Sequence, residues 1–136
     1  MSTIVSTIIH VSLMAAPGQS YTDAHQAHLE TGRPLVVLVG AEWCPACRTM
    51  KQSTIPQAQQ QGVLSGVAFA QVNTDQQPDL ARKLMRGGSI PQLIVYHKSA
   101  TGWQRRELLG AQSVSAISRL ITPPQPATPV TPRIGR

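Results

Sequence analysis

The sequence predicts an α/β domain, in which short buried strands alternate with helices. Residues 35–39 form a continuous apolar run, Leu-Val-Val-Leu-Val, which is typical of a central strand covered on both faces. The two cysteines of the chain, Cys44 and Cys47, follow this run directly and begin a segment with helical character. Two later apolar runs, at residues 67–72 and 92–97, supply further strands.

Periodicity, capping residues and turn signals predict the order of the elements. We expect a helix over residues 22–31, the strand over 35–39, a helix from the cysteines to about residue 60, a strand over 67–72, a helix from Pro78, a hairpin of strands 92–97 and 103–109 around a turn at 98–102, and a last helix capped by Ser113. Pro56 should kink or break the long helix, because proline lacks the N–H that a helix interior requires. Gly87-Gly88 should end the helix that starts at Pro78.

The two ends of the chain have a different character. Residues 4–16 are uncharged and fairly apolar, and Ala16-Pro17-Gly18 is acceptable as a processing site, so residues 1–20 resemble an export signal. No Lys or Arg precedes the run, and its alternation would also suit a strand. We favour an exported, periplasmic protein, with a cytoplasmic location as the alternative. Residues 122–136 are rich in proline and without helical or strand period, so we expect a disordered tail after a domain at 21–121.

Charge and composition argue against several classes of partner. The net charge of +6 comes from 12 basic and 6 acidic residues, but the basic residues are scattered and form no stripe. We therefore attribute the charge to solvated surface and expect no nucleic-acid partner. No stretch is long and apolar enough for an unambiguous transmembrane helix, so we expect no membrane span. We expect a monomer.

The motif Trp43-Cys44-Pro45-Ala46-Cys47 carries the chemistry. Two thiols spaced i, i+3 at a helix N-terminus lie on one face, close enough to form a disulfide, and the unpaired N–H groups of the helix favour a thiolate on the first. Pro45 suits the first helical position, because its missing N–H had no intrahelical partner. The motif makes Cys44 the candidate nucleophile and Cys47 the resolving thiol, with the Trp43 ring beside the Cys44 sulfur.

A metal site is the main alternative. His25 and His28 form a second pair, and two histidines with Cys44 and Cys47 would make a tetrahedral zinc set. The strand at 35–39 lies between the pairs, however, and the histidines fall in a separate helix. There we expect surface or edge positions, with His28 on a modest inner stripe beside Ala24 and Ala27. Arg48 stands where a c-type haem site needs a histidine. We assign no metal ligand and no cofactor, and keep a metal-binding or redox-sensing module as the alternative function.

Four motifs in this order resemble the thioredoxin-like family over residues 21–121. They are Ala41-Glu42-Trp43-Cys44 with Cys47, then Val72-Asn73-Thr74-Asp75, Ser89-Ile90-Pro91 and Leu109-Gly110-Ala111. The resemblance implies a thioredoxin fold, with a central mixed sheet flanked by helices and ending in a β-hairpin and a C-terminal helix. It also implies a cis Ile90–Pro91 bond against the disulfide, in a loop that pairs with an extended substrate peptide. Trp43, Pro45, Ala46, Ile90 and Pro91 are then the substrate-binding candidates.

The same resemblance implies a thiol–disulfide oxidoreductase that reduces protein disulfides. Cys44 would attack the substrate disulfide and Cys47 would resolve the mixed disulfide, so the partners are protein disulfides or dithiols and a redox partner that the sequence does not identify. Leu38 replaces a buried aspartate that the family uses for proton transfer at the resolving cysteine, and Gln71 replaces a nearby lysine. We therefore expect resolution to slow more steeply at low pH than in thioredoxin. A fold that only binds peptides is a third interpretation.

Overall fold

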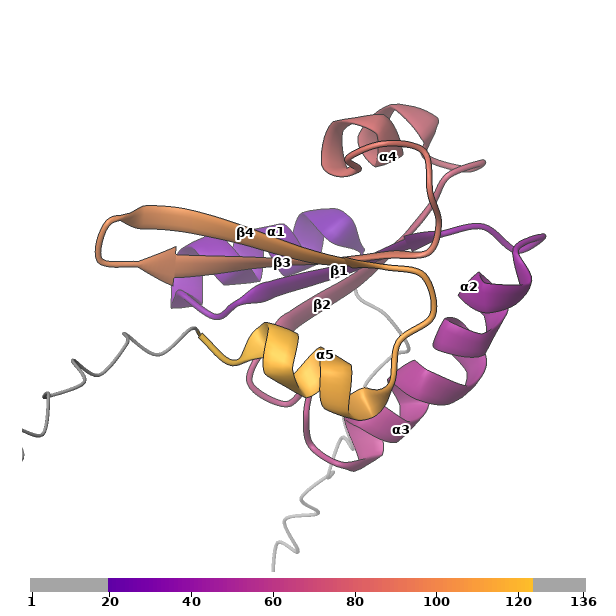
Figure 1. The fold of residues 1–136 in the computed structure, drawn as a ribbon. Helices are drawn as coiled ribbons and strands as arrows, with labels where there is room; N and C mark the ends of the chain where they lie inside the picture. Colours follow the sequence, from indigo (N-terminus) through magenta and orange to yellow (C-terminus); the bar gives the residue numbers. More distant parts are fainter. Residues whose placement is uncertain (1–19, 124–136) are drawn as a thin grey trace, which may run out of the picture.

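A computed structural model describes residues 20–123, so the expected export signal or N-terminal strand and nearly all of the proline-rich tail lie outside the described residues. The described part is a four-stranded mixed sheet with helices on both faces (Figure 1). Its elements are α1 (Tyr21–Thr31), β1 (Leu35–Gly40), α2 (Pro45–Thr49), η1 (Met50–Thr54), α3 (Ile55–Gln60), β2 (Ala68–Asn73), α4 (Pro78–Leu84), β3 (Gln92–Ser99), β4 (Gly102–Leu109) and α5 (Val114–Ile121).

The apolar run forms the central strand, as its composition predicts. The strand order is β2-β1-β3-β4, with β1 parallel to β2 and antiparallel to β3, and β3 antiparallel to β4. Val37 pairs with Ala70 on one side and with Ile94 on the other. All five apolar residues of β1 are at most 4% exposed, because helices cover both faces of the sheet.

Alternate residues of β1 face two separate hydrophobic cores. Leu35, Val37 and Val39 pack with residues of α1 and α4 on one face of the sheet. Val36 and Leu38 pack on the other face with residues of η1, α3 and α5. Figure 1 shows α4 above the sheet, α1 behind the strands, and α2, α3 and α5 below. The loop after β1 crosses to the lower layer, so the active-site helix begins where the central strand ends.

The helical segments around Pro56 follow one another without interruption, so the break, one of the two expected outcomes, is wrong. The central turn, Met50–Thr54, is a π-helix, and the Ile55 N–H donates to the Met50 carbonyl, five residues back. Pro56 follows within the first turn of α3, where its missing N–H is tolerated. Pro56 cannot donate a backbone hydrogen bond, and the π-helical turn places this missing bond where η1 meets α3. Met50, the first residue of this turn, is completely buried.

The helix at Pro78 ends earlier than the glycines suggest. Met85 already has an extended backbone, and α4 stops at Leu84. The Arg86 N–H donates to the buried Gln92 side chain at 3.1 Å, and the Arg86 carbonyl accepts from the same amide at 2.9 Å. These tertiary hydrogen bonds hold Arg86 outside the helix. No helix among residues 20–123 is long and apolar enough to span a bilayer.

Candidate active site

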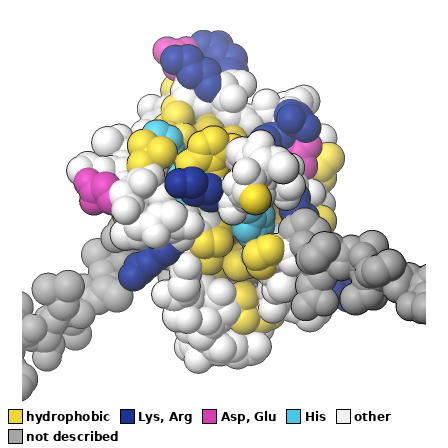
Figure 2. Space-filling model, turned by 90° about the vertical axis from the view of Figure 1, so that its left-hand side faces the viewer, with side chains coloured by type: hydrophobic (Ala, Val, Ile, Leu, Met, Phe, Trp, Pro, Cys, Tyr) yellow, Lys and Arg dark blue, Asp and Glu magenta, His cyan; other side chains and the backbone are white. Residues whose placement is uncertain are grey.

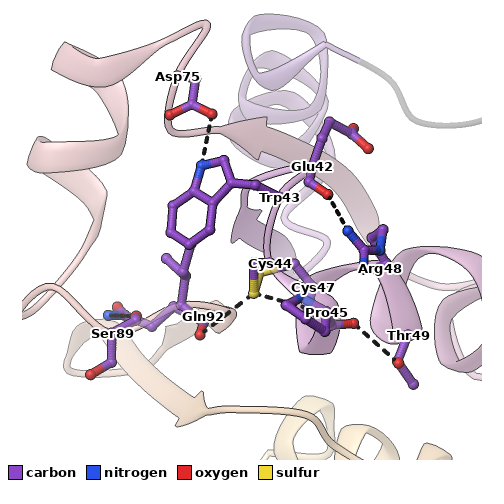
Figure 3. The surroundings of a disulfide bond; sticks show 11 residues. Glu42, Trp43, Cys44, Pro45, Cys47, Arg48, Thr49, Asp75, Ser89 and Gln92 are labelled. Atoms are coloured by element: carbon purple, nitrogen blue, oxygen red, sulfur yellow. Dashed lines mark hydrogen bonds between the residues drawn. A yellow bond between two sulfur atoms is a disulfide. The ribbon is translucent and has the colours of Figure 1, made fainter.

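The two cysteines lie at the junction of β1 and the following helix. Cys44 is the N-cap of α2 and Cys47 lies in its first turn, with Pro45 at the first helical position. The sulfurs are bonded as a disulfide, and the Cys47 N–H points at the Cys44 sulfur from 3.2 Å (Figure 3). In the reduced state the same N–H can donate to a Cys44 thiolate, which lowers the pKa of a thiol. The local sequence therefore favours Cys44 as the anionic sulfur.

A second loop approaches the disulfide from a distant part of the chain. The Ile90 carbonyl oxygen lies 4.0 Å from the Cys44 sulfur. The Ile90–Pro91 bond is cis, as the family resemblance implies. Pro91 is buried and its carbonyl accepts from the Gly110 N–H at 2.8 Å, whereas Ile90 is half-buried. The structure thus brings Cys44, Cys47 and this loop together.

Gln92 holds the loop in place, and sequence reasoning did not single it out. Its side chain is fully buried at the start of β3. The amide donates to the carbonyls of Arg86 and Ser89 and accepts from the Arg86 N–H, at 2.9 to 3.1 Å. A buried amide without such partners would cost about 1–3 kcal/mol, so these contacts fix the loop that carries Ile90. The available signal was a glutamine at the beginning of an otherwise apolar strand.

Trp43 forms the exposed rim of the site. Its side chain is 66% exposed, and its indole Nε1–H donates to Asp75 at 3.0 Å (Figure 3). Asp75 is itself positioned by the Asn73 side chain, which accepts from the Asp75 and Gln76 N–H groups. The hydrogen bond to Asp75, 32 positions later in the sequence, therefore orients the Trp43 ring. Pro45 is exposed and Ala46 is half-buried on the neighbouring helix turn.

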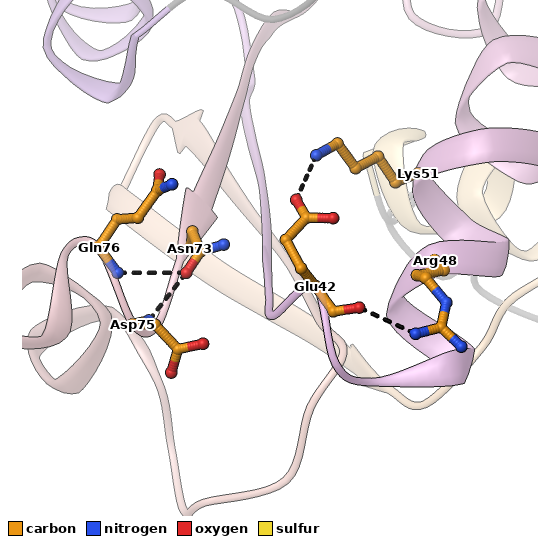
Figure 4. A network of polar contacts seen from close by, with 6 residues as sticks. All are labelled: Glu42, Arg48, Lys51, Asn73, Asp75 and Gln76. Atoms are coloured by element: carbon orange, nitrogen blue, oxygen red, sulfur yellow. Dashed lines mark hydrogen bonds and ion pairs between the residues drawn. The ribbon is translucent and has the colours of Figure 1, made fainter.

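A charged network supports the loop that precedes Cys44. Lys51 forms an ion pair with the Glu42 carboxylate at 2.5 Å, and the Arg48 guanidinium donates to the Glu42 carbonyl at 3.0 Å (Figure 4). Both cations come from the helix that starts at Cys44. Because the ion pair is largely exposed, its contribution to stability is small, and its effect is to fix the loop on the helix.

A pocket of about 230 Å³ lies on the other side of the disulfide, beside Cys47. Leu38 and Gln71, which are paired across β1 and β2, line it, so neither an aspartate nor a lysine is present at these positions. Gly40 also lines it, and a Cβ atom there would lie only 3.0 Å from the Cys47 sulfur. Glu42 is the one carboxylate among the described lining residues, and it is engaged by Lys51. Cys47 therefore adjoins a polar pocket without a buried acid.

The histidine pair lies elsewhere in the fold. His25 and His28 belong to α1 and share a groove with Leu35, at the beginning of β1, whereas the cysteines follow its end. His28 is 3% exposed and contacts the Arg33 carbonyl through Nδ1, which confirms its expected place on the inner stripe of the helix. Within residues 20–123 no three or more His, Cys, Asp or Glu side chains are grouped to hold a metal ion. The four-residue zinc set is therefore not assembled.

A family model described as Thioredoxin matches residues 18–123, most of the sequence. The chain belongs to the thioredoxin family. Solved thioredoxin structures share its fold. A thioredoxin from Thermus thermophilus is 22% identical, with 75% of this chain and 81% of that chain covered and a TM-score of 0.61. Trxlp from Edwardsiella tarda EIB202 is 26% identical, with 77% and 96% covered and a TM-score of 0.59.

One curated relative matches a shorter stretch. The chloroplastic 5'-adenylylsulfate reductase 3 of Arabidopsis thaliana is 36% identical over 67 residues, which are 48% of this chain and 14% of that protein. The chain thus spans a small part of that relative's length. Proteins of the thioredoxin family act on protein disulfides, and this member has its two cysteines at bonding distance beside the cis-proline loop. The chain thus carries a bonded cysteine pair on a thioredoxin fold.

Proposed function

We propose that this thioredoxin-family protein reduces disulfides of extended protein segments, with Cys44 as the nucleophile and Cys47 as the resolving thiol. The observation that carries the assignment is that the two sulfurs have different surroundings. Cys44 adjoins the Ile90 carbonyl at the substrate loop, whereas Cys47 adjoins Gly40 and the pocket behind the disulfide. A substrate that pairs with the loop therefore meets Cys44 first.

The reaction proceeds in two exchanges. The Cys44 thiolate attacks one sulfur of the substrate disulfide, forms a mixed disulfide and releases the other sulfur as a thiolate. Cys47, after losing its proton, attacks the Cys44 sulfur and releases the second substrate thiolate. The substrate gains two electrons and the protein is left with the Cys44–Cys47 bond. A dithiol or flavin-linked reductant must then return the pair to the reduced form. Both cysteines come from one chain, so a monomer suffices.

The substrate peptide is proposed to bind between the two loops. The free backbone of Ile90 would pair with an extended segment as an added strand, next to the buried Pro91. Trp43, Pro45 and Ala46 would contact the residues that flank the substrate cysteine. The Trp43 ring is suited to this role, because its indole N–H is already bound to Asp75 and its apolar face remains exposed.

The missing acid at position 38 should be visible in the pH dependence. In Leu38→Asp, a carboxylate beside Cys47 can accept its proton, so we expect the acidic limb of the turnover profile to move to lower pH. Burial of the new group should also lower the free energy of unfolding by several kcal/mol. Turnover of an insulin-type disulfide substrate from pH 5 to 9 measures the first effect. Leu38→Asn is the matched control, and an equal shift in both variants would contradict the proton-transfer explanation.

The direction of electron flow is tested by the reduction potential of the Cys44–Cys47 pair. Equilibration with glutathione, with thiol trapping as the readout, should give a value near or below about −250 mV, which marks a reductant. A value above about −180 mV would instead indicate an oxidant or isomerase, and would support the periplasmic location proposed from residues 1–20. If the cysteines formed no intramolecular disulfide, the proposal would fail and a binding module would replace it.

A further inference from the structure

A groove of about 330 Å³ lies at the end of the molecule opposite the disulfide. Its described lining residues are Tyr21, His25, His28, Leu29, Leu35, Tyr96 and Trp103, from α1, β1 and the β3–β4 hairpin. Leu29 is 59% and Trp103 50% exposed, which is unusual for such large apolar side chains. Figure 2 looks onto this end and shows hydrophobic side chains adjoining histidines.

Two pairs of adjoining rings line the groove, one stacked and one tilted. The His28 ring lies 4.4 Å from the Trp103 ring, and Tyr21 stacks on His25 at 5.6 Å. Lys98 lies over the Trp103 ring, with Nζ 5.9 Å from the centroid. Burial, and secondarily the neighbouring Tyr96, raises the pKa of Tyr21. None of its described lining residues is acidic.

The segment after α5 has a spacing that neither a helix nor a strand would explain. Pro123, Pro126, Pro129 and Pro132 recur at every third position. A polyproline II helix has three residues per turn, so these four prolines would form one continuous apolar face. Residues 122–132 carry no charged side chain, so they match a groove of rings and histidines without an ionic requirement.

The segment starts close enough to reach the groove. The Thr122 carbonyl accepts from Arg106 on β4 at 3.0 Å, and Trp103 lies three residues further along the same strand, a distance of about 10 Å. Residues 123–132 would span about 30 Å as a polyproline II helix. β4 is the edge strand of the sheet, so the segment needs only to pass around this edge to arrive at Trp103.

We propose that residues 123–132 bind in this groove of their own chain as a polyproline II helix, with the in-register prolines packed on Trp103, Tyr21 and Tyr96. Aromatic-lined grooves recognise such helices because the ligand is already extended and loses little conformational entropy on binding. A tethered segment also has an effective concentration in the millimolar range, which compensates for a small contact area. The site is separate from the disulfide and does not depend on the redox function.

The first test compares proline variants of the full chain by the NMR signal of the Trp103 indole N–H. Pro126→Ala/Pro129→Ala removes two in-register prolines, and we expect the Trp103 signal to shift while that of Trp43 stays in place. Pro124→Ala changes a proline outside the register and is the matched control, with no shift expected. An unmoved Trp103 signal in the double variant, or an equal shift in the control, would overturn the proposal.

The second test reads the segment itself. In the full chain the NMR order parameters of the Ala127 and Val130 amides should be as high as those of the folded domain, because a bound segment has restricted backbone motion. In Trp103→Ala these order parameters should fall. Trp43→Ala removes the other exposed tryptophan and should leave them unchanged. Amides that are equally mobile in all three proteins would contradict binding. If the high order parameters of these amides were lost on tenfold dilution, the segment would bind the groove of a second copy and the proposal would be wrong. High order parameters that persisted in Trp103→Ala would also overturn it.

Discussion

Replacement of Cys44 by serine is expected to abolish reduction of a protein disulfide, whereas Cys47→Ser is expected to stop the reaction after its first step. A serine hydroxyl at position 44 is not ionised at neutral pH and cannot attack a disulfide. With serine at position 47, Cys44 still attacks, but nothing resolves the mixed disulfide. The Cys47→Ser protein should therefore accumulate covalently bound to its substrate. Non-reducing electrophoresis after acid quenching measures this adduct.

The double variant Cys44→Ser/Cys47→Ser is the control for adducts that arise by other routes, and it should form none. If Cys44→Ser trapped the substrate and Cys47→Ser did not, the roles of the two cysteines would be reversed. If the double variant kept the full activity on a protein substrate, the cysteine chemistry would be irrelevant to the function. In that case the fold would act as a peptide-binding domain.

Gly40→Ala should have the second-largest effect, because the new methyl group would meet the resolving cysteine. A Cβ atom at Gly40 would lie 3.0 Å from the Cys47 sulfur and 3.1 Å from its Cβ. At these distances the Cys47 side chain must give way by a few tenths of an ångström. We expect the free energy of unfolding to fall by about 1–3 kcal/mol, as for other overpacked sites. Turnover should fall by up to about tenfold, since the required shift of a few tenths of an ångström is a fraction of the 1 Å displacement that can cost about 10²-fold.

Gly66→Ala is the matched control for Gly40→Ala. A Cβ atom at Gly66 would point into open space, with no atom of a residue other than its chain neighbours within 4 Å. Chemical denaturation and substrate turnover of both variants separate the contact at Cys47 from the general effect of replacing glycine. Equal behaviour of the two proteins would show that the space beside Cys47 tolerates a methyl group, and the close-approach explanation would be wrong.

Much of the fold follows from local patterns in the sequence. The apolar run at 35–39 predicts a strand buried on both faces, and the structure confirms it. Ser113 caps α5 by accepting from the Ala116 N–H, as expected for a serine before an amphipathic helix. The position of Cys44 at a helix start likewise depends on neighbouring residues alone. These features were predictable because the interactions that determine them are local.

The remaining features depend on contacts between distant residues. Proline at position 56 signals a disturbed helix, but it does not specify the π-helical turn at Met50–Thr54, whose first residue is buried in the core. The early end of α4 goes with hydrogen bonds between the Gln92 side chain and Arg86, six residues apart, which no helix or strand period predicts. The Trp43 ring is oriented by Asp75, and His28 is buried under Trp103. No local pattern contains these pairings, so sequence reasoning placed the residues without their partners.

The hydrogen bonds of Gln92 have a consequence for the choice of substrate. Since one buried amide ties Arg86 and Ser89 to the first residue of β3, the loop that carries Ile90 is attached to the central sheet. A loop attached in this way changes its conformation little when a substrate binds. The adjustment must come from the other molecule, which has to present its disulfide in a segment that can straighten. Disulfides in mobile or unfolding regions should therefore be reduced before those held in rigid cores.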